Sequence, residues 1–226
     1  MHKLIMTSNA YRQSSLVGPD VHDSDPDNVL LSRFPLRRLD AEAIRDSILK
    51  VAGRLDSTPF GPAEEIEVTP ENEVVSKGVK TGFRRSIYLL QRRSTPLTML
   101  ELFDAPRMDP NCLQRAYSTV PTQALQLWNS EMTRESSRYF AGRVIDAVGD
   151  DLEQQIERVY LLALSRRPTV EESRLGREAL TGLNRDWLEH LEKDIPAEPK
   201  SPRARWLALA TFCHVVLNSP QFIYVD

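Results

Sequence analysis

Apolar residues along most of the chain recur at steps of three and four, which is the spacing of an amphipathic helix. The clearest case follows Asp40, a residue type suited to cap a helix start. The apolar positions of this run are Ile44, Ile48, Val51, Ala52 and Leu55. The pattern predicts a helix with one buried face.

The second half of the chain continues in the same way. Thr122 and Ser130 are suited to cap two helices, and Thr169 with Glu172 forms the pattern of a capping box. The capping box opens a long helix that reaches about residue 192. The predicted inner faces of the helices are Met132, Tyr139, Phe140, Val144 and Val148, then Leu152, Ile156, Val159, Tyr160 and Leu164, then Leu175, Ala179, Leu183, Trp187 and Leu191.

The last helix, Trp206 to Leu217, is apolar nearly all round, as a central buried helix requires. A Pro-rich linker over residues 193–204 precedes it. At the other end, "MHKLIMTSNAYRQSS" is typical of an amphipathic helix with Leu4, Ile5, Ala10 and Tyr11 on its inner face. Two interpretations of this start stay open: the tail of a longer protein, or a reading frame begun at an internal Met.

Residues 56–93 have a different character, rich in Pro, Gly and Glu and without a helical period. "EIEVT" and "EVVSK" alternate weakly, and "RRSIYLLQRR" holds a short β-prone run between arginines. We expect a β-rich insertion over 56–93, with a small hairpin or sheet around residues 65–91. The predicted fold is therefore mainly α, a multi-helix orthogonal bundle in a single domain over residues 1–226.

Composition excludes some classes of partner. With 226 residues, 41% of them hydrophobic, the chain is long enough to bury a core. Its net charge of -3 provides no global positive field, so we expect no nucleic-acid partner. No apolar run approaches the roughly 20 residues of a membrane span, and no secretory signal opens the chain.

Metal and cofactor motifs are missing from the sequence. The four histidines are far apart and show no ligand spacing, so we expect no metal site. Cys112 and Cys213 are too few for a zinc site but leave one bridge possible. A c-type haem needs C-x-x-C-H, and the residue three before Cys213 is Ala210, so we expect no haem on this chain and interpret Cys213 and His214 as packing.

Four segments in order carry a family resemblance. They are "HKLIMTSNAYRQSS", "RRLDAEAIRDSILKVAGRLD", the stretch from "RRSIYLLQRR" to "FDAPRMDPNCLQRAYSTVPTQALQLWNS", and "RVYLLALSRRPTVEE" with "CHVVLNSPQFIYVD". The chain closely resembles the planctomycete cytochrome c-associated C-terminal domain of unknown function. The resemblance implies a haem-binding module upstream and an extracytoplasmic location. It implies no activity.

Candidate functional residues concentrate in the irregular loop from residue 104 to residue 123, because loops positioned by a scaffold often carry sites. The candidates for binding a ligand or partner are Asp104, Cys112, Arg115, Thr119 and Gln123, joined by Arg84 and Arg85 from the recurring arginine pairs. Paired arginines bind anions through forked donors. The structural alternative is that Asp104 pairs with Arg115, Thr119 and Thr122 cap, Cys112 packs, and the arginines are solvated or pair with acidic residues.

Three functions follow from these observations. The first is an accessory or interaction domain that packs against haem-bearing or other upstream domains and has no catalytic motif. The second is a hydrolase or lyase acting on carbohydrate or another anionic polymer, which needs two carboxylates facing each other, such as Glu101 and Asp104. The third is an intracellular helical adaptor.

Overall fold

The computed structural model describes residues 1–106, 114–194 and 200–225. These residues are mainly helical with small two-stranded sheets, which confirms the predicted fold class. The chain divides into two compact units, residues 1–39 with 223–226 and residues 40–222. The assignment of one domain to the whole chain stays a prediction.

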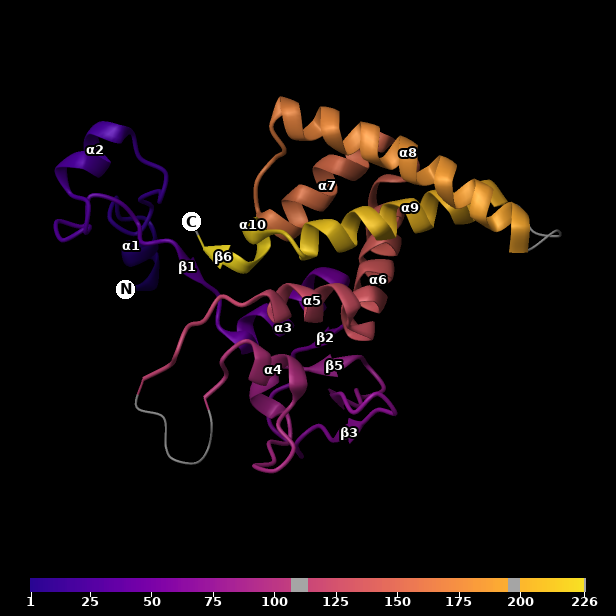
Figure 1. Ribbon diagram of the computed structural model, residues 1–226, viewed down its shortest axis with the longest axis horizontal. Helices are drawn as coiled ribbons and strands as arrows, with labels where there is room; N and C mark the ends of the chain where they lie inside the picture. The colour runs from indigo at the N-terminus through magenta and orange to yellow at the C-terminus, as the bar shows by residue number, and fades with distance from the viewer. Residues whose placement is uncertain (107–113, 195–199, 226) are drawn as a thin grey trace. The chain divides into compact units, whose positions relative to one another are not determined.

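The second unit is built on seven helices among its described residues, together with a short α10 at its end. They are α3 (Ala41–Ala52), α4 (Thr98–Leu102), α5 (Pro121–Asn129), α6 (Glu131–Val148), α7 (Leu152–Leu164), α8 (Val170–Asp194) and α9 (Lys200–Leu217), with α10 at Pro220–Ile223. Helix α9 packs on α6 and α8, and α6 also packs on α3. Figure 1 shows α8 and α9 side by side over much of their length.

Helix α3 has the predicted apolar face at Ile44, Ile48, Val51 and Ala52, which are buried together with Leu49. The predicted Leu55 lies beyond the end of the helix. It ends at Gly53, which takes the left-handed conformation that glycine adopts without a steric cost. Asp40 occupies the N-cap position, but its side chain bonds the Tyr117 hydroxyl at 3.1 Å and makes no cap bond.

The predicted faces of α6 and α9 are largely confirmed. Phe140 and Val144 of α6 are fully buried, as is Leu217 of α9. Tyr139 is exposed, which corrects its assignment to the inner face, and its ring lies 4.0 Å from the Arg54 guanidinium carbon. Helix α9 starts at Lys200, so the helical structure takes in residues assigned to the linker, and Trp206 is only half-buried.

The start of α8 confirms the capping box. The Thr169 amide donates to the Glu172 carboxylate at 2.8 Å, and the Glu172 amide donates to the Thr169 hydroxyl at 3.2 Å. Its predicted inner face is wrong at Leu175 and Ala179, which are exposed, whereas Leu180 and Leu191 are buried. A stripe at steps of four drifts by about 40° per step around a helix, so it cannot face one neighbour over this length.

The helix α5 starts two residues earlier than predicted, and Thr122 does not cap it. Val120 is the N-cap and Pro121 opens the helix, where the missing N–H of proline has no cost. Gln123 reaches back so that its side-chain oxygen accepts from the Val120 amide at 3.5 Å.

The small sheets lie mostly where the sequence predicts a β-rich insertion. Strands β3 (Ile66–Val68) and β4 (Val74–Ser76) form an antiparallel hairpin, and β2 (Leu55–Asp56) pairs in parallel with β5 (Phe83–Arg84). The expected β run after Arg85 is instead a 3-10 turn over Ser86–Tyr88, because Asp46 fixes both the amide and the hydroxyl of Ser86.

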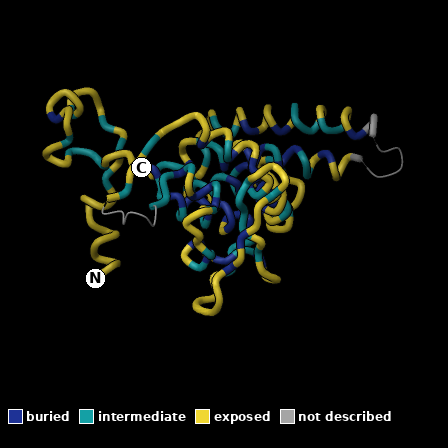
Figure 2. Tube along the Cα trace, turned by 60° about the horizontal axis from the view of Figure 1, so that its bottom comes forward, coloured by how far each residue is buried: buried dark blue, intermediate teal, exposed yellow. Residues whose placement is uncertain are grey.

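The first unit contains α1 (His2–Met6), α2 (Pro19–Ser24) and a short antiparallel pair of β1 (Arg37–Arg38) with β6 (Tyr224–Val225). Helix α1 stops at Met6, and Leu4, Ile5, Ala10 and Tyr11 are exposed, so the predicted inner face is wrong. No apolar side chain in residues 1–39 is buried. Figure 2 accordingly draws this unit almost wholly as exposed or intermediate.

Candidate functional site

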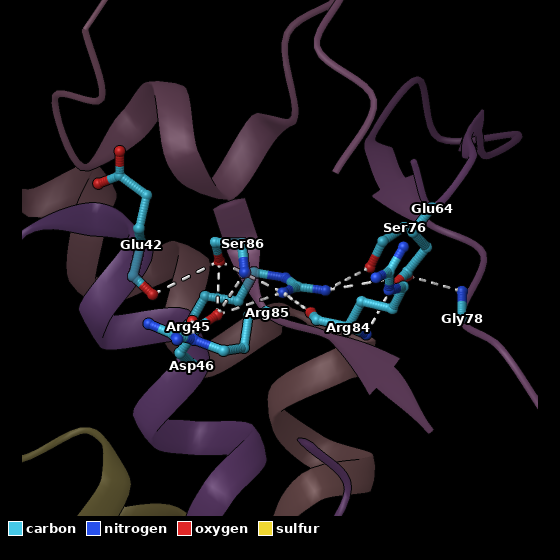
Figure 3. A network of polar contacts seen from close by, with 9 residues as sticks. All are labelled: Glu42, Arg45, Asp46, Glu64, Ser76, Gly78, Arg84, Arg85 and Ser86. Atoms are coloured by element: carbon cyan, nitrogen blue, oxygen red, sulfur yellow. Dashed lines mark hydrogen bonds and ion pairs between the residues drawn. The ribbon is translucent and has the colours of Figure 1, made fainter. Parts of the chain in front are cut away.

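A network of polar side chains runs through the second unit from α3 to the β hairpin (Figure 3). Its centre is Arg45, which lies within the apolar face of α3 and is fully buried. The guanidinium donates to the Arg84 carbonyl at 2.9 Å, to the Ser76 hydroxyl at 2.9 Å and to the Ser86 hydroxyl at 3.3 Å. Burial lowers the pKa of Arg45, while the negative charges of Glu64 and Asp46 oppose this shift.

Glu64 is the buried carboxylate of this network. Its two oxygens accept from the Gly78 amide at 2.9 Å and from the Arg84 amide at 2.6 Å. One oxygen also lies 4.0 Å from a guanidinium nitrogen of Arg45. Glu64 therefore ties the end of the hairpin to β5 while it balances the charge of the buried arginine.

Arg84 and Arg85, both predicted to bind a ligand or partner, have partners within the chain. The Arg84 guanidinium donates to the backbone carbonyls of Thr58, Phe60 and Pro62 and lies 4.4 Å from the centre of the Tyr88 ring. Arg85 is half-exposed, and its Nε lies 3.6 Å from a carboxylate oxygen of Asp46. Arg84 holds the Pro-Gly loop before β3, which is a structural role.

The 104–123 loop contains two separate polar clusters in its described part. Asp104 takes a positive φ of 63°, and its carboxylate accepts from the amide and the hydroxyl of Ser118 at 2.8 and 2.9 Å. The buried Gln123 amide nitrogen donates to the carbonyls of Leu102 and Ser118 at 2.9 and 3.2 Å. These bonds join the two ends of the loop.

Arg115 belongs to the second cluster. It forms a forked pair with Glu42 of α3 at 2.8 and 2.9 Å, and Asp40 lies 3.9 Å away. The hydrogen bond from Arg115 lowers the pKa of Glu42 and raises that of Arg115 itself. The alternative prediction that Asp104 pairs with Arg115 is therefore wrong. Both side chains nevertheless have structural roles, Asp104 with Ser118 and Arg115 with Glu42. Thr119 is exposed beside them, and Cys112 lies outside the described residues.

The Cys213–His214 pair is packing, as the sequence predicts. Cys213 is a fully buried free thiol, and burial raises its pKa well above the ordinary range. The His214 ring stacks on Trp128 with centroids 4.9 Å apart, and its Nε2 lies 3.3 Å from the Leu127 carbonyl oxygen. Burial lowers the pKa of His214, which favours the neutral ring. Val215, expected in the same core, is half-exposed.

Two cavities open in the second unit. One of about 470 Å³ lies between residues 89–97 and α4, and Arg92 and Arg93 are on its rim. The other, about 630 Å³, lies beside the β hairpin and the start of α6, with five glutamates among its lining residues. Sequence reasoning missed both the buried Arg45 network and the first cavity. The signals present in the sequence were an arginine inside the apolar stripe of α3 and the arginine pair before Pro96.

Among the described residues no group of three or more His, Cys, Asp or Glu side chains is placed to hold a metal ion. None of the helices in this part of the chain has the length and apolar composition to cross a membrane. In the first cavity, the charged donors of Arg92 and Arg93 lie beside an apolar surface.

Comparison with protein-family models identifies the family of the chain. Residues 1–180 match the family model of PSD1, a protein of unknown function (DUF1553). No curated protein and no solved structure matches the chain. Because the matched residues make up most of the chain, this protein belongs to the PSD1 (DUF1553) family.

Proposed function

We propose that the chain is a non-catalytic accessory domain that binds other protein domains through its first unit. The observation that carries this proposal is the unburied apolar surface of residues 1–39. The large apolar side chains exposed there include Leu4, Leu16, Val29, Leu30, Leu31 and Leu36. A segment of this length rarely builds its own core, and exposed apolar surface of this kind typically marks a protein interface.

The turn after α2 is the most specific part of this surface. Asp25 accepts from the amides of Val29 and Leu30 at 2.8 and 3.1 Å, and Arg33 donates to the Asp25 carbonyl at 2.7 Å. Leu31 is held at a positive φ of 54°, which is costly for a branched side chain. The turn thus presents three consecutive apolar residues, of which Leu30 is 79% and Leu31 70% exposed, in a fixed conformation. Pre-organisation of this kind reduces the entropy cost of binding.

The partner in this proposal is a haem-bearing or other domain encoded upstream, in an extracytoplasmic protein. This choice of partner is supported by the family resemblance of the four sequence segments. It does not depend on the exposed apolar surface of residues 1–39. The haem belongs to the partner, because the sequence around Cys213 lacks the second thiol of a c-type attachment site. An intracellular adaptor would use the same surface and differ only in its partner.

The enzymatic alternative ranks lower because one of its two candidate carboxylates is already engaged. Asp104 accepts hydrogen bonds from the amide and the hydroxyl of Ser118. A glycosidase needs one carboxylate held for the sugar and one that transfers a proton.

Calorimetric titration tests the docking surface. The probe is the upstream c-type haem domain that the resemblance implies, produced with its haem attached. Leu30→Ser combined with Leu31→Ser should weaken binding at least tenfold, whereas Val170→Ser, which replaces an apolar side chain 92% exposed on the second unit, should not. Equal binding by all three proteins, or no complex with the wild type, would overturn the proposal. Thermal melts confirm that the variants fold.

A further inference from the structure

The 470 Å³ cavity has an apolar floor and a polar rim. Leu89, Leu97 and Leu100 line it and are almost completely buried. The rim comprises Gln91, Arg92, Arg93 and Ser94, all exposed, and Glu101 of α4 lines the same cavity. Two guanidinium groups against one carboxylate leave this mouth with a local positive charge.

Both ends of the rim segment are anchored. The Leu90 amide donates to the Glu64 carbonyl at 2.9 Å, and the Glu64 amide donates to the Tyr88 carbonyl at 2.8 Å. At the other end, Thr98 begins α4, and its hydroxyl accepts from the Val74 amide of β4 at 2.8 Å. The cavity is therefore held open by the β hairpin and the buried Glu64, which favours a preformed binding site.

The Arg92–Arg93 pair differs from two other arginine pairs of the second unit in its place on a cavity, and not in a lack of partners, since Arg93 also interacts within the chain. Arg84 and Arg85 bond backbone carbonyls and Asp46, as described above. Arg166 forms a forked pair with Glu172, and Arg167 lies 3.0 Å from Glu157. Arg92 and Arg93 line a cavity whose volume is typical of small-molecule sites.

We propose that this cavity binds a small amphiphilic anion, with its carboxylate, phosphate or sulfate at Arg92 and Arg93 and its apolar body on the leucine floor. Guanidinium groups favour such anions through paired, charge-assisted donors. The leucines favour an alkyl or aromatic body because its burial removes apolar surface from water. The larger cavity fits this ligand less well, since its five glutamates outnumber its three basic residues, Arg45, Lys77 and Arg134.

This site lies within residues 40–222 and does not depend on the proposed docking surface. The experiment compares four probes by calorimetric titration of the whole chain: octyl phosphate below its micelle concentration, inorganic phosphate, 1-octanol and octylammonium. Octyl phosphate should bind at least tenfold more tightly than each of the other three. Its affinity should fall as sodium chloride is raised from 50 to 500 mM, since salt screens the attraction between exposed charges.

Two variants and one control assign the binding to this cavity. Arg92→Gln with Arg93→Gln should weaken octyl phosphate binding about tenfold or more, as the loss of charged hydrogen bonds predicts. Ala105→Trp, at a lining position, should block the cavity while both arginines stay. Arg185→Gln removes one positive charge from an exposed position of α8 and should change nothing.

Several outcomes would overturn the proposal. They are equal binding of octanol and octyl phosphate, unchanged binding in the double arginine variant with a normal thermal melt, or binding that survives Ala105→Trp. Sedimentation with phosphatidylglycerol vesicles separates the sources of the anion. Retention on these vesicles that is lost in the same variants would identify the ligand as a lipid, whereas octyl phosphate binding without retention identifies a free small molecule.

Discussion

Single arginine side chains connect segments of the second unit that are distant in sequence. Arg45 joins α3 to the hairpin and to β5, Arg84 holds the loop before β3, and Arg115 fastens the 104–123 loop to α3. A guanidinium suits this role because it offers five donors in a planar fork. The consequence is that loss of an arginine should reduce stability in proportion to its burial.

Arg45→Met should cost about 3 to 5 kcal/mol, because it leaves the buried Glu64 carboxylate without its countercharge and removes donors from the Arg84 carbonyl and Ser76. Urea denaturation followed by circular dichroism measures the change. The matched control, Arg185→Met on exposed α8, should stay within about 0.5 kcal/mol of the wild type. A loss below about 1 kcal/mol for Arg45→Met would show that the network is not a stability element.

Arg115 and Glu42 should show a smaller coupling, about 1 kcal/mol, since both side chains are about one-third exposed and water screens their attraction. A double-mutant cycle with Arg115→Ala and Glu42→Ala isolates this value. Additive effects of the two substitutions would rule out the pair as a tie for the loop. An Asp104→Asn variant is the companion, because it weakens the Ser118 contacts and leaves the Arg115 pair intact.

At the scale of elements, capping side chains fix the residues at which helices α7 and α8 begin. Helix α7 opens at Asp151, whose carboxylate accepts from the Gln154 amide at 3.0 Å, and α8 opens at the Thr169–Glu172 capping box. Arg166 adds a forked pair to Glu172 and also bonds Gln221 at 2.7 Å. The start of α8 is therefore tied to the residues that follow α9.

The charge of Glu172 should make this end of α8 sensitive to acid. The Arg166 hydrogen bond lowers the pKa of Glu172 from 4.5 to about 2, so the folded chain binds this proton less readily than the unfolded chain. Its contribution is present above pH 4.5 and is lost as the pH falls toward about 2. Because Arg166 is partly in water, we expect about 1 kcal/mol or less.

The comparison is between thermal melts of the wild type and Glu172→Gln over the range from pH 6 to pH 2. Glutamine keeps an acceptor for the Thr169 amide, so the substitution removes the charge and preserves the cap. The gap in Tm should be largest at pH 6 and should close near pH 2. A gap that does not change with pH would mean that the cap, and not the charge, stabilises the helix.

At the scale of the whole chain, the two units differ in kind. The second unit contains the apolar core, from Ala41 to Phe222, whereas the first contains no buried apolar side chain and is organised by polar contacts around Asp25 and Arg33. Its stability should therefore be local, while the cooperative unfolding of the protein should belong to residues 40–222.

Deletion of residues 1–36 should leave the free energy of unfolding within about 1 kcal/mol of the full chain, because little apolar burial is lost. The deletion keeps the β1–β6 pair of Arg37 and Arg38 with Tyr224 and Val225. Urea denaturation of both proteins gives the midpoint and the slope of the unfolding transition, which report its free energy and cooperativity. A large loss of stability or of cooperativity would mean that the first unit contributes to the core.

The sequence alone determined the elements whose signals are local. The apolar stripe of α3, the capping box of α8, the hairpin within the β-rich insertion and the packing role of Cys213 each depend on residues a few positions apart. Their physical causes are helix periodicity, backbone capping and burial of apolar side chains, and all of these act within one element. The same signals identified the mainly helical fold class.

The partners of the polar residues depend on how the helices and strands pack in space. Arg45 meets Ser76 and Ser86 across 31 and 41 residues of chain, and Arg115 meets Glu42 across 73. Which acidic residue an arginine pairs with depends on the loop closures that the packed helices permit. The composition of the chain does not contain this information. The exposed face of α8, the unburied first unit and the cavity at Arg92 and Arg93 were likewise decided by packing, because an apolar residue is buried only where a neighbour arrives to cover it.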